Sequence, residues 1–176
     1  MSVWTLFLEY RADLQYTASW LICLAALYWG SWPERLVALV WIVLFHIVDG
    51  IYHQLFDTEY IFTGVDVWHA GLDALAAAAW MFIAVQSNRN YPMWIAALQI
   101  LAACAHLARG IAEPITQIAY ATMAFAPGYL QLIIFAAGLI RHVLRKQQHG
   151  EYRDWRPPLV NPFRARTIHD ILKGQT

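Results

Sequence analysis

Charged residues and cysteines are scarce in this sequence. Lysine, arginine, aspartate and glutamate make up 14% of its 176 residues, whereas a soluble domain usually carries about 25%. The two cysteines, Cys23 and Cys104, lie inside apolar runs, where a thiol behaves as a small hydrophobic group. These shortages exclude an ordinary soluble domain, a disordered chain, a disulfide-stabilised secreted module, a zinc-thiolate protein and a basic nucleic-acid binder.

Hydrophobic residues make up 60% of the chain and form runs long enough to cross a bilayer, for which a helix needs about 20 residues. We therefore predict an all-α, polytopic membrane protein, with a bundle of about five transmembrane helices in residues 1–146. The predicted spans are residues 14–32, 36–56, 64–86, 93–112 and 119–141. Pro127 and Gly128 interrupt the last span, so residues 113–128 form either a half-helix or part of a kinked fifth span.

The net charge of zero conceals an uneven distribution. Residues 1–140 carry 4 basic and 9 acidic side chains, and residues 141–176 carry 8 basic and 3 acidic ones. Basic residues favour the cytoplasmic side of a membrane, so residues 147–176 are predicted to be a mostly extended cytoplasmic tail. This tail either binds anionic lipid headgroups or only fixes the topology. With five spans, the N-terminus lies outside an inner or plasma membrane.

Ionisable side chains inside the predicted spans are the most informative feature. They are His46, Asp49, His53, Asp66, His69, Asp73, His106 and Arg109. On a helix, the spacing i, i+3, i+7 keeps residues near one face, so residues 46, 49 and 53 form one stripe and residues 66, 69 and 73 form another. The stripes are expected to line a polar site in the outer half of the membrane.

The two stripes have complementary residue types when their helices run antiparallel. The complementary register pairs His46 with Asp73, Asp49 with His69, and His53 with Asp66. A register shifted by about one turn would instead place Asp49 opposite Asp73 and His53 opposite His69. In the next hairpin, His106 is expected beside Asp73, with Arg109 one turn further out.

An ionisable side chain inside a membrane costs about 2.5–3.5 kcal/mol on insertion scales, which makes a functional site the first hypothesis. One chemistry is a divalent transition metal held by imidazole and carboxylate ligands. The candidate metal ligands are His46, His53, His69, His106, Asp49 and Asp73. A second is a proton or small-cation path, because histidine titrates near neutral pH. Haem is disfavoured, because carboxylates flank each candidate histidine and burden an apolar porphyrin pocket.

A third chemistry is the binding or conversion of a lipid-like ligand by paired acids beside aromatic walls. The segments FHIVDGIYH, with His46 and Asp49, GLDALAAAAW, with Asp73, and FAPGYL, with Pro127, resemble the EXPERA superfamily. That family includes emopamil-binding sterol isomerase and the sigma-2 receptor. The resemblance implies an enzyme or receptor that holds a sterol- or isoprenoid-like ligand with His46, Asp49 and Asp73.

The alternative from a different class is a non-catalytic accessory or interaction subunit of a membrane complex. In that interpretation the histidines and aspartates form a structural network that locks three helices together. The basic tail would then dock a membrane-protein partner. The sequence alone leaves these alternatives open.

Overall fold

The computed structural model describes residues 3–56, 67–111 and 117–157, and most of these residues are helical. The described elements are α1 (Val3–Trp29), α2 (Trp32–Trp41), the π-helical segment η1 (Ile42–Val48), α3 (Asp49–Phe56), α4 (Val67–Gln86), α5 (Tyr91–Ile111) and α6 (Gln117–His149). The predicted all-α class is therefore confirmed. Proline stands in the first turn of both α2 and α5, where its missing N–H costs no helical hydrogen bond.

Within the described residues, four helices are long and apolar enough to cross a membrane. They are Trp32–Phe56, which joins α2, η1 and α3, then Val67–Gln86, Tyr91–Ile111 and Ala126–His149. They correspond to four of the five predicted spans. α1 covers most of the remaining predicted span, residues 14–32. α6 is a single helix from Gln117 to His149 that contains Pro127. Residues 117–128 are therefore continuous with the rest of this helix and do not form a separate half-helix.

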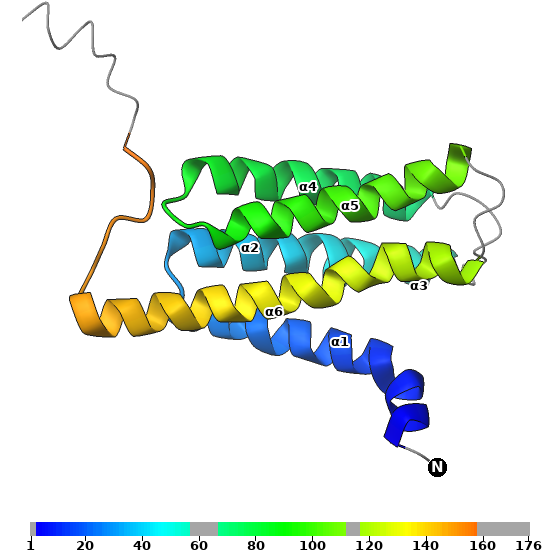
Figure 1. Ribbon diagram of the computed structural model, residues 1–176, viewed down its shortest axis with the longest axis horizontal. Helices are drawn as coiled ribbons and strands as arrows, with labels where there is room; N and C mark the ends of the chain where they lie inside the picture. Colours follow the sequence, from blue (N-terminus) through cyan, green and yellow to red (C-terminus); the bar gives the residue numbers. More distant parts are fainter. Residues whose placement is uncertain (1–2, 57–66, 112–116, 158–176) are drawn as a thin grey trace, which may run out of the picture.

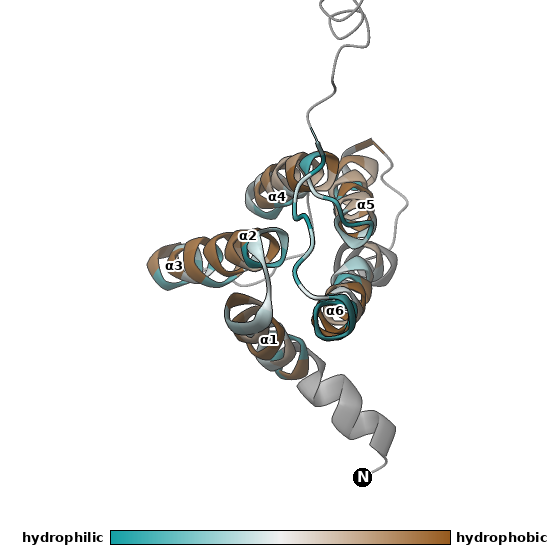
Figure 2. Ribbon diagram, turned by 90° about the vertical axis from the view of Figure 1, so that its left-hand side faces the viewer, coloured by the Kyte–Doolittle hydropathy of each residue, from teal (hydrophilic) through white to brown (hydrophobic). Residues whose placement is uncertain are grey.

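The long helices run side by side along the longest axis of the molecule (Figure 1). Neighbouring pairs are α1 with α2, α2 with α4, α4 with α5, α5 with α6, and α6 with α1, so the helices close into a ring when seen end-on (Figure 2). One end of the bundle holds the α1–α2 turn, the α4–α5 loop and the end of α6. We call this the strap end, because residues 150–157, the strap described below, cross it.

Large apolar side chains fill the middle of the ring. Trp80, Ile95 and Phe135 are fully buried there, on α4, α5 and α6 respectively. The indole Nε1–H of Trp80 donates to the carbonyl of Val37 at 3.3 Å, so this large side chain is buried without leaving its one donor unpaired. This hydrogen bond joins α2 to α4, and the three side chains form an apolar layer in the middle of the bundle.

α5 and α6 approach closely at Gly138, and a substitution there tests the packing. A Cβ at this position would lie 2.6 Å from Cγ of Tyr91, whose ring stacks on Phe135. Gly138→Ala should therefore lower the free energy of unfolding by about 1–3 kcal/mol, measured by unfolding in detergent micelles. Gly71→Ala is the matched control, because nothing lies within 4 Å of the added Cβ. Equal stability of the two variants would contradict this packing.

Helix α6 continues into the predicted tail. Residues 147–149 belong to α6, which ends at His149, whereas a mostly extended tail is predicted from residue 147 onwards. Gly150 follows with φ of 75°, a left-handed conformation that lets glycine end a helix at low cost. Residues 158–176 lie outside the described part of the chain, and the prediction for them stays a prediction.

Residues 150–157 turn back across the end of the bundle, and we call them the strap. Ser87 and Trp155 form an isolated antiparallel bridge, and the N–H of Asn88 donates to the carbonyl of Asp154 at 2.8 Å. The strap therefore lies on the α4–α5 loop. This segment is non-helical, as predicted, but it is docked on the bundle.

Candidate functional site

Three predicted site residues come together at the end of the bundle opposite the strap. Asp49 and His53 lie one turn apart on α3, and His69 lies in the first turn of α4, where these helices meet at one end of the bundle (Figure 1). One ligand atom from each residue lies within 4.8 Å of the other two. We call Asp49, His53 and His69 the three-ligand cluster.

The distances inside the cluster suit a small metal ion. Nε2 of His69 is 3.2 Å from Oδ1 of Asp49, Nε2 of His53 is 3.7 Å from the same oxygen, and the two Nε2 atoms are 3.4 Å apart. Two ligands bound at about 2.0–2.1 Å in a tetrahedral zinc site lie about 3.3–3.4 Å from each other. The three atoms therefore resemble one face of a coordination tetrahedron.

Neighbouring aromatic residues hold the cluster in place. The indole Nε1–H of Trp68 donates to Oδ1 of Asp49 at 3.1 Å, and the Trp68 ring stacks on Tyr52 with centroids 4.1 Å apart and planes 11° apart. Such partners orient a carboxylate that binds a metal. The side chains of Asp49, His53 and His69 are 18%, 25% and 22% exposed, so all three are only partly buried among the described residues.

His46 lies apart from the cluster, and its predicted pairing with Asp73 is wrong. Its ring packs between Tyr16 and Trp20 of α1, and its Nε2 lies 2.9 Å from Oγ of Ser19. Because the Ser19 hydroxyl donates to a backbone carbonyl of α1, Nε2 of His46 has to be the donor. Its buried Nδ1 then carries a lone pair that no described residue approaches as a hydrogen-bond partner.

The π-helical segment explains this error. The predicted stripe assumed α-helical spacing through residues 46, 49 and 53, but η1 spans Ile42–Val48 with i→i+5 hydrogen bonds. The wider turn rotates His46 away from the face that Asp49 and His53 share. His46 therefore faces α1, whereas the two later residues face α4.

Asp73 belongs to a second polar group, in the interior of the bundle. Its Oδ1 accepts from Nε2 of Gln99 at 2.6 Å, and its Oδ2 lies 3.2 Å from Nε2 of His106. Gln131 on α6 donates to Oε1 of Gln99 at 2.8 Å and to the carbonyl of Ile95. This network links α4, α5 and α6, and it contains the predicted contact between Asp73 and His106.

Sequence analysis did not predict the two glutamines of this network. Gln99 and Gln131 carry no charge, so a search for ionisable groups passes over them, although an amide inside an apolar span was a usable signal.

Two other predicted contacts are present in the structure. They are the pair of Asp49 and His69 from the complementary register and the contact of His53 and His69 from the shifted register. Asp66 lies outside the described residues. Arg109 is half-buried in the last turn of α5.

A buried ion-pair network that sequence analysis did not predict occupies the strap end. Arg89, 7% exposed, forms ion pairs with Glu34 of α2 at 3.2 Å and Asp154 of the strap at 2.8 Å. Glu34 is fully buried, and its carboxylate also accepts from the N–H of Ser31 at the start of α2. Nothing in the linear sequence places Glu34 and Asp154 beside Arg89.

His142 and Tyr152 complete this network. Burial raises the pKa of Tyr152, so its hydroxyl keeps its proton at neutral pH and can donate to Nδ1 of His142, 2.8 Å away. Nδ1 also faces a guanidinium nitrogen of Arg89 at 3.4 Å, which can only donate. Nδ1 of His142 is therefore the acceptor, and Nε2 carries the hydrogen that points to Oγ of Ser31 at 3.2 Å.

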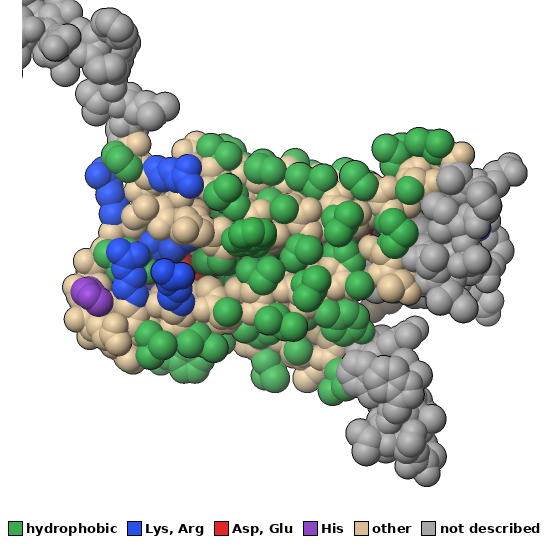
Figure 3. Space-filling model, viewed as in Figure 1, with side chains coloured by type: hydrophobic (Ala, Val, Ile, Leu, Met, Phe, Trp, Pro, Cys, Tyr) green, Lys and Arg blue, Asp and Glu red, His purple; other side chains and the backbone are tan. Residues whose placement is uncertain are grey.

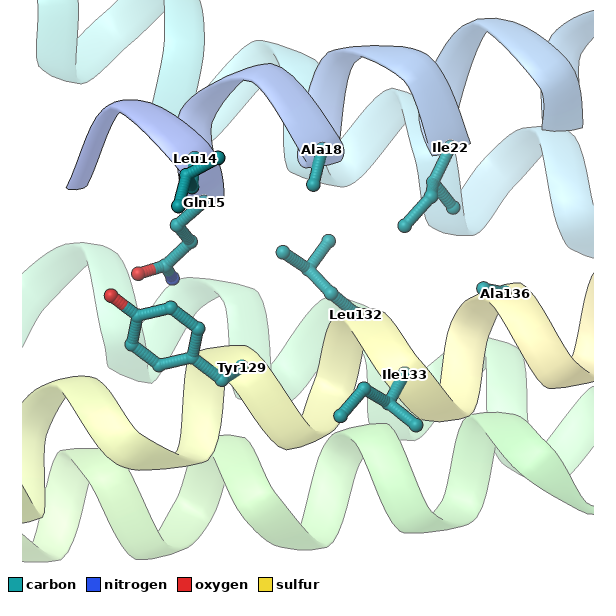
Figure 4. A pocket seen from close by; sticks show the side chains of 8 residues that line it. All are labelled: Leu14, Gln15, Ala18, Ile22, Tyr129, Leu132, Ile133 and Ala136. Carbon is teal, nitrogen blue, oxygen red and sulfur yellow. The ribbon is translucent and has the colours of Figure 1, made fainter. Parts of the chain in front are cut away.

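An apolar groove of about 300 Å³ lies between α1 and α6 (Figure 4). Its lining residues are Leu14, Gln15, Ala18 and Ile22 of α1 and Tyr129, Leu132, Ile133 and Ala136 of α6. The polar ends of Gln15 and Tyr129 point toward each other at one end, and Leu132 points into the middle. Its apolar walls are suited to hydrocarbon and offer no set of metal ligands.

Comparison of the chain with protein-family models, with curated proteins and with solved structures found no match. The fold by itself assigns the chain to the all-α proteins, with four apolar helices of membrane-spanning length among the described residues. A more specific assignment depends on the geometry of the sites.

Proposed function

We propose that this protein is a multi-pass membrane protein that binds a divalent transition metal through Asp49, His53 and His69. The observation that supports this proposal is the triangle of ligand atoms, with sides of 3.2, 3.4 and 3.7 Å. Two imidazole nitrogens and one carboxylate oxygen form a donor set that suits zinc and other first-row transition metals. The partial exposure of the three side chains supports a site with an open position.

The proposed topology has α1 as a fifth span and the strap end in the cytoplasm. The charge distribution supports it, because Arg35, Arg89 and the basic residues described between residues 141 and 156 lie at the strap end. α1 begins and α6 ends at opposite ends of the bundle (Figure 1), which agrees with an odd number of spans. The three-ligand cluster would then lie near the outer face of an inner or plasma membrane.

A titration of the purified protein with Zn²⁺ in detergent micelles tests the proposed site. The wild type should bind one equivalent, and His69→Gln should lower its affinity for Zn²⁺ by at least about 100-fold, because two ligands hold zinc far more weakly than three. Asp49→Asn should weaken it similarly. His46→Gln is the matched control, since His46 is an intramembrane histidine outside the cluster. An unchanged affinity in His69→Gln, or an equal loss in His46→Gln, would overturn the proposal.

A second candidate is the accessory-subunit function, and the network around Asp73 favours it. Both carboxylate oxygens of Asp73 are engaged by Gln99 and His106, as in a polar network that only joins helices. The EXPERA-like alternative has weaker geometric support, because His46 faces α1, Asp49 faces α4 and Asp73 faces α5. Loss of zinc binding without loss of folding in His69→Gln would favour the metal site over both.

A further inference from the structure

Four exposed arginines surround the place where α6 passes into the strap. They are Arg141, Arg145, Arg153 and Arg156, and we call them the basic rim. Lysine and arginine side chains gather at this end of the molecule (Figure 3). The rim therefore forms a concentrated positive surface where α6 leaves its candidate membrane span, Ala126–His149.

The acidic side chains described at this end are already committed to other partners. Glu34 and Asp154 pair with Arg89, and Glu151 pairs with Lys146 at 2.6 Å. Within the described part of the chain, no carboxylate forms an ion pair with an arginine of the rim. The positive charge of the rim is therefore left for an external anion.

Two rim arginines are held in place by the strap and the loop beneath it. The guanidinium of Arg145 lies over the ring of Tyr152, 4.2 Å from its centroid. Nε of Arg156 donates to the carbonyl of Ser87 at 3.1 Å, which leaves its terminal nitrogens to donate elsewhere. Pre-organised guanidinium groups lose less conformational entropy when they bind an anion, and their planar donors match phosphate oxygens.

Tyr152 brings two guanidinium groups near each other. Arg89 lies over the same ring at 4.1 Å, but its charge is balanced by Glu34 and Asp154. The charge of Arg145 has no such balance among the described residues. An anion bound at the same time by Arg145 of α6 and by an arginine of the strap would link the two segments and so favour the docked position of the strap.

The position of the rim and its charge select one kind of anion. The rim lies where α6 leaves its apolar span, the level at which a bilayer presents phosphate headgroups. The remainder of this chain is an unsuitable occupant, because residues 158–176 carry 3 basic side chains and 1 acidic side chain. Charge complementarity therefore favours an anionic phospholipid.

We propose that the basic rim binds the phosphate of anionic phospholipid headgroups, and that this contact holds the strap against the bundle. This proposal is independent of the metal site at the opposite end. Each headgroup phosphate would accept hydrogen bonds from the terminal nitrogens of rim arginines. The strap would be most firmly docked in a membrane that contains anionic lipid.

Lipid binding can be measured by titrating the detergent-solubilised protein with phosphatidylglycerol or phosphatidylcholine. The wild type should prefer phosphatidylglycerol, and Arg145→Gln should reduce this preference about fivefold, which corresponds to about 1 kcal/mol. Arg141→Gln should act in the same direction, and because Arg141 is an exposed side chain on α6, its loss leaves the packing intact. Arg35→Gln is the matched control, since Arg35 is exposed at the same end but outside the rim.

Three results would overturn the proposal. These are equal binding of the two lipids, an equal loss in Arg35→Gln, and displacement of phosphatidylglycerol by low concentrations of inorganic phosphate, which would indicate a soluble ligand. Hydrogen exchange gives a second measurement on the unmutated protein. Amides of residues 150–157 should exchange more slowly in nanodiscs that contain phosphatidylglycerol than in phosphatidylcholine nanodiscs. Equal exchange in the two membranes would overturn the proposed control of the strap.

Discussion

Replacing Arg89 by glutamine should lower the free energy of unfolding by about 3–5 kcal/mol, because it leaves the fully buried carboxylate of Glu34 without its counter-charge. The same substitution removes the ion pair with Asp154 that holds the strap. Unfolding in mixed micelles measures the loss. Arg35→Gln, an exposed arginine next to Glu34 in sequence, is the control and should change stability by less than about 0.5 kcal/mol.

A double variant separates the ion pair from general damage to the fold. Glu34→Gln together with Arg89→Gln should recover part of the stability, because no buried charge is then left unpaired. The two single effects should therefore not add, as expected for groups in direct contact. Simple additivity, or a loss below about 1 kcal/mol in Arg89→Gln, would contradict the buried position of this network.

Replacing Asp73 by leucine should cost about 2–6 kcal/mol of stability. The substitution removes the acceptors of both Gln99 and His106, and each buried polar group left without a partner costs about 1–3 kcal/mol. Asp73→Asn should cost much less, since its amide oxygen can still accept from Gln99 and its amide nitrogen can donate to His106. Both variants can be compared by unfolding in the same micelles.

Measuring the affinity for Zn²⁺ provides the control for the substitutions of Asp73. Asp73→Asn should bind Zn²⁺ as the wild type does, because Asp73 lies outside the three-ligand cluster. If Asp73→Leu were fully stable while Asp73→Asn lost zinc, Asp73 would be a metal ligand and its structural role would be refuted.

Local pattern was sufficient to predict the helices and two of the polar contacts. Apolar runs of membrane-spanning length indicate helices, and short connections make neighbouring helices antiparallel. Residues at similar sequence distances on either side of a connection then lie side by side, which places Asp49 beside His69 and Asp73 beside His106. The pairing of His46 failed because it required one helical period throughout, whereas η1 introduces a wider turn. A shift of register within a helix leaves little trace in a pattern of residue types.

The network at the strap end could not be predicted, for a different reason. Glu34, Arg89 and Asp154 are separated by 55 and 65 residues in sequence. Glu34 and Arg89 stand near predicted helix ends and Asp154 stands in the predicted tail, and a charged residue is ordinary in both places. Only the closure of the helices into a ring brings them together. The docking of the strap likewise depends on backbone hydrogen bonds to the α4–α5 loop, which any residue type can form.

The strap also affects the order of events during synthesis. Glu34 and Arg89 leave the ribosome well before Asp154 and Tyr152, so a growing chain that has already placed its first helices still lacks two partners of Arg89. The strap end can therefore reach its final packing only when almost the whole described chain has been made.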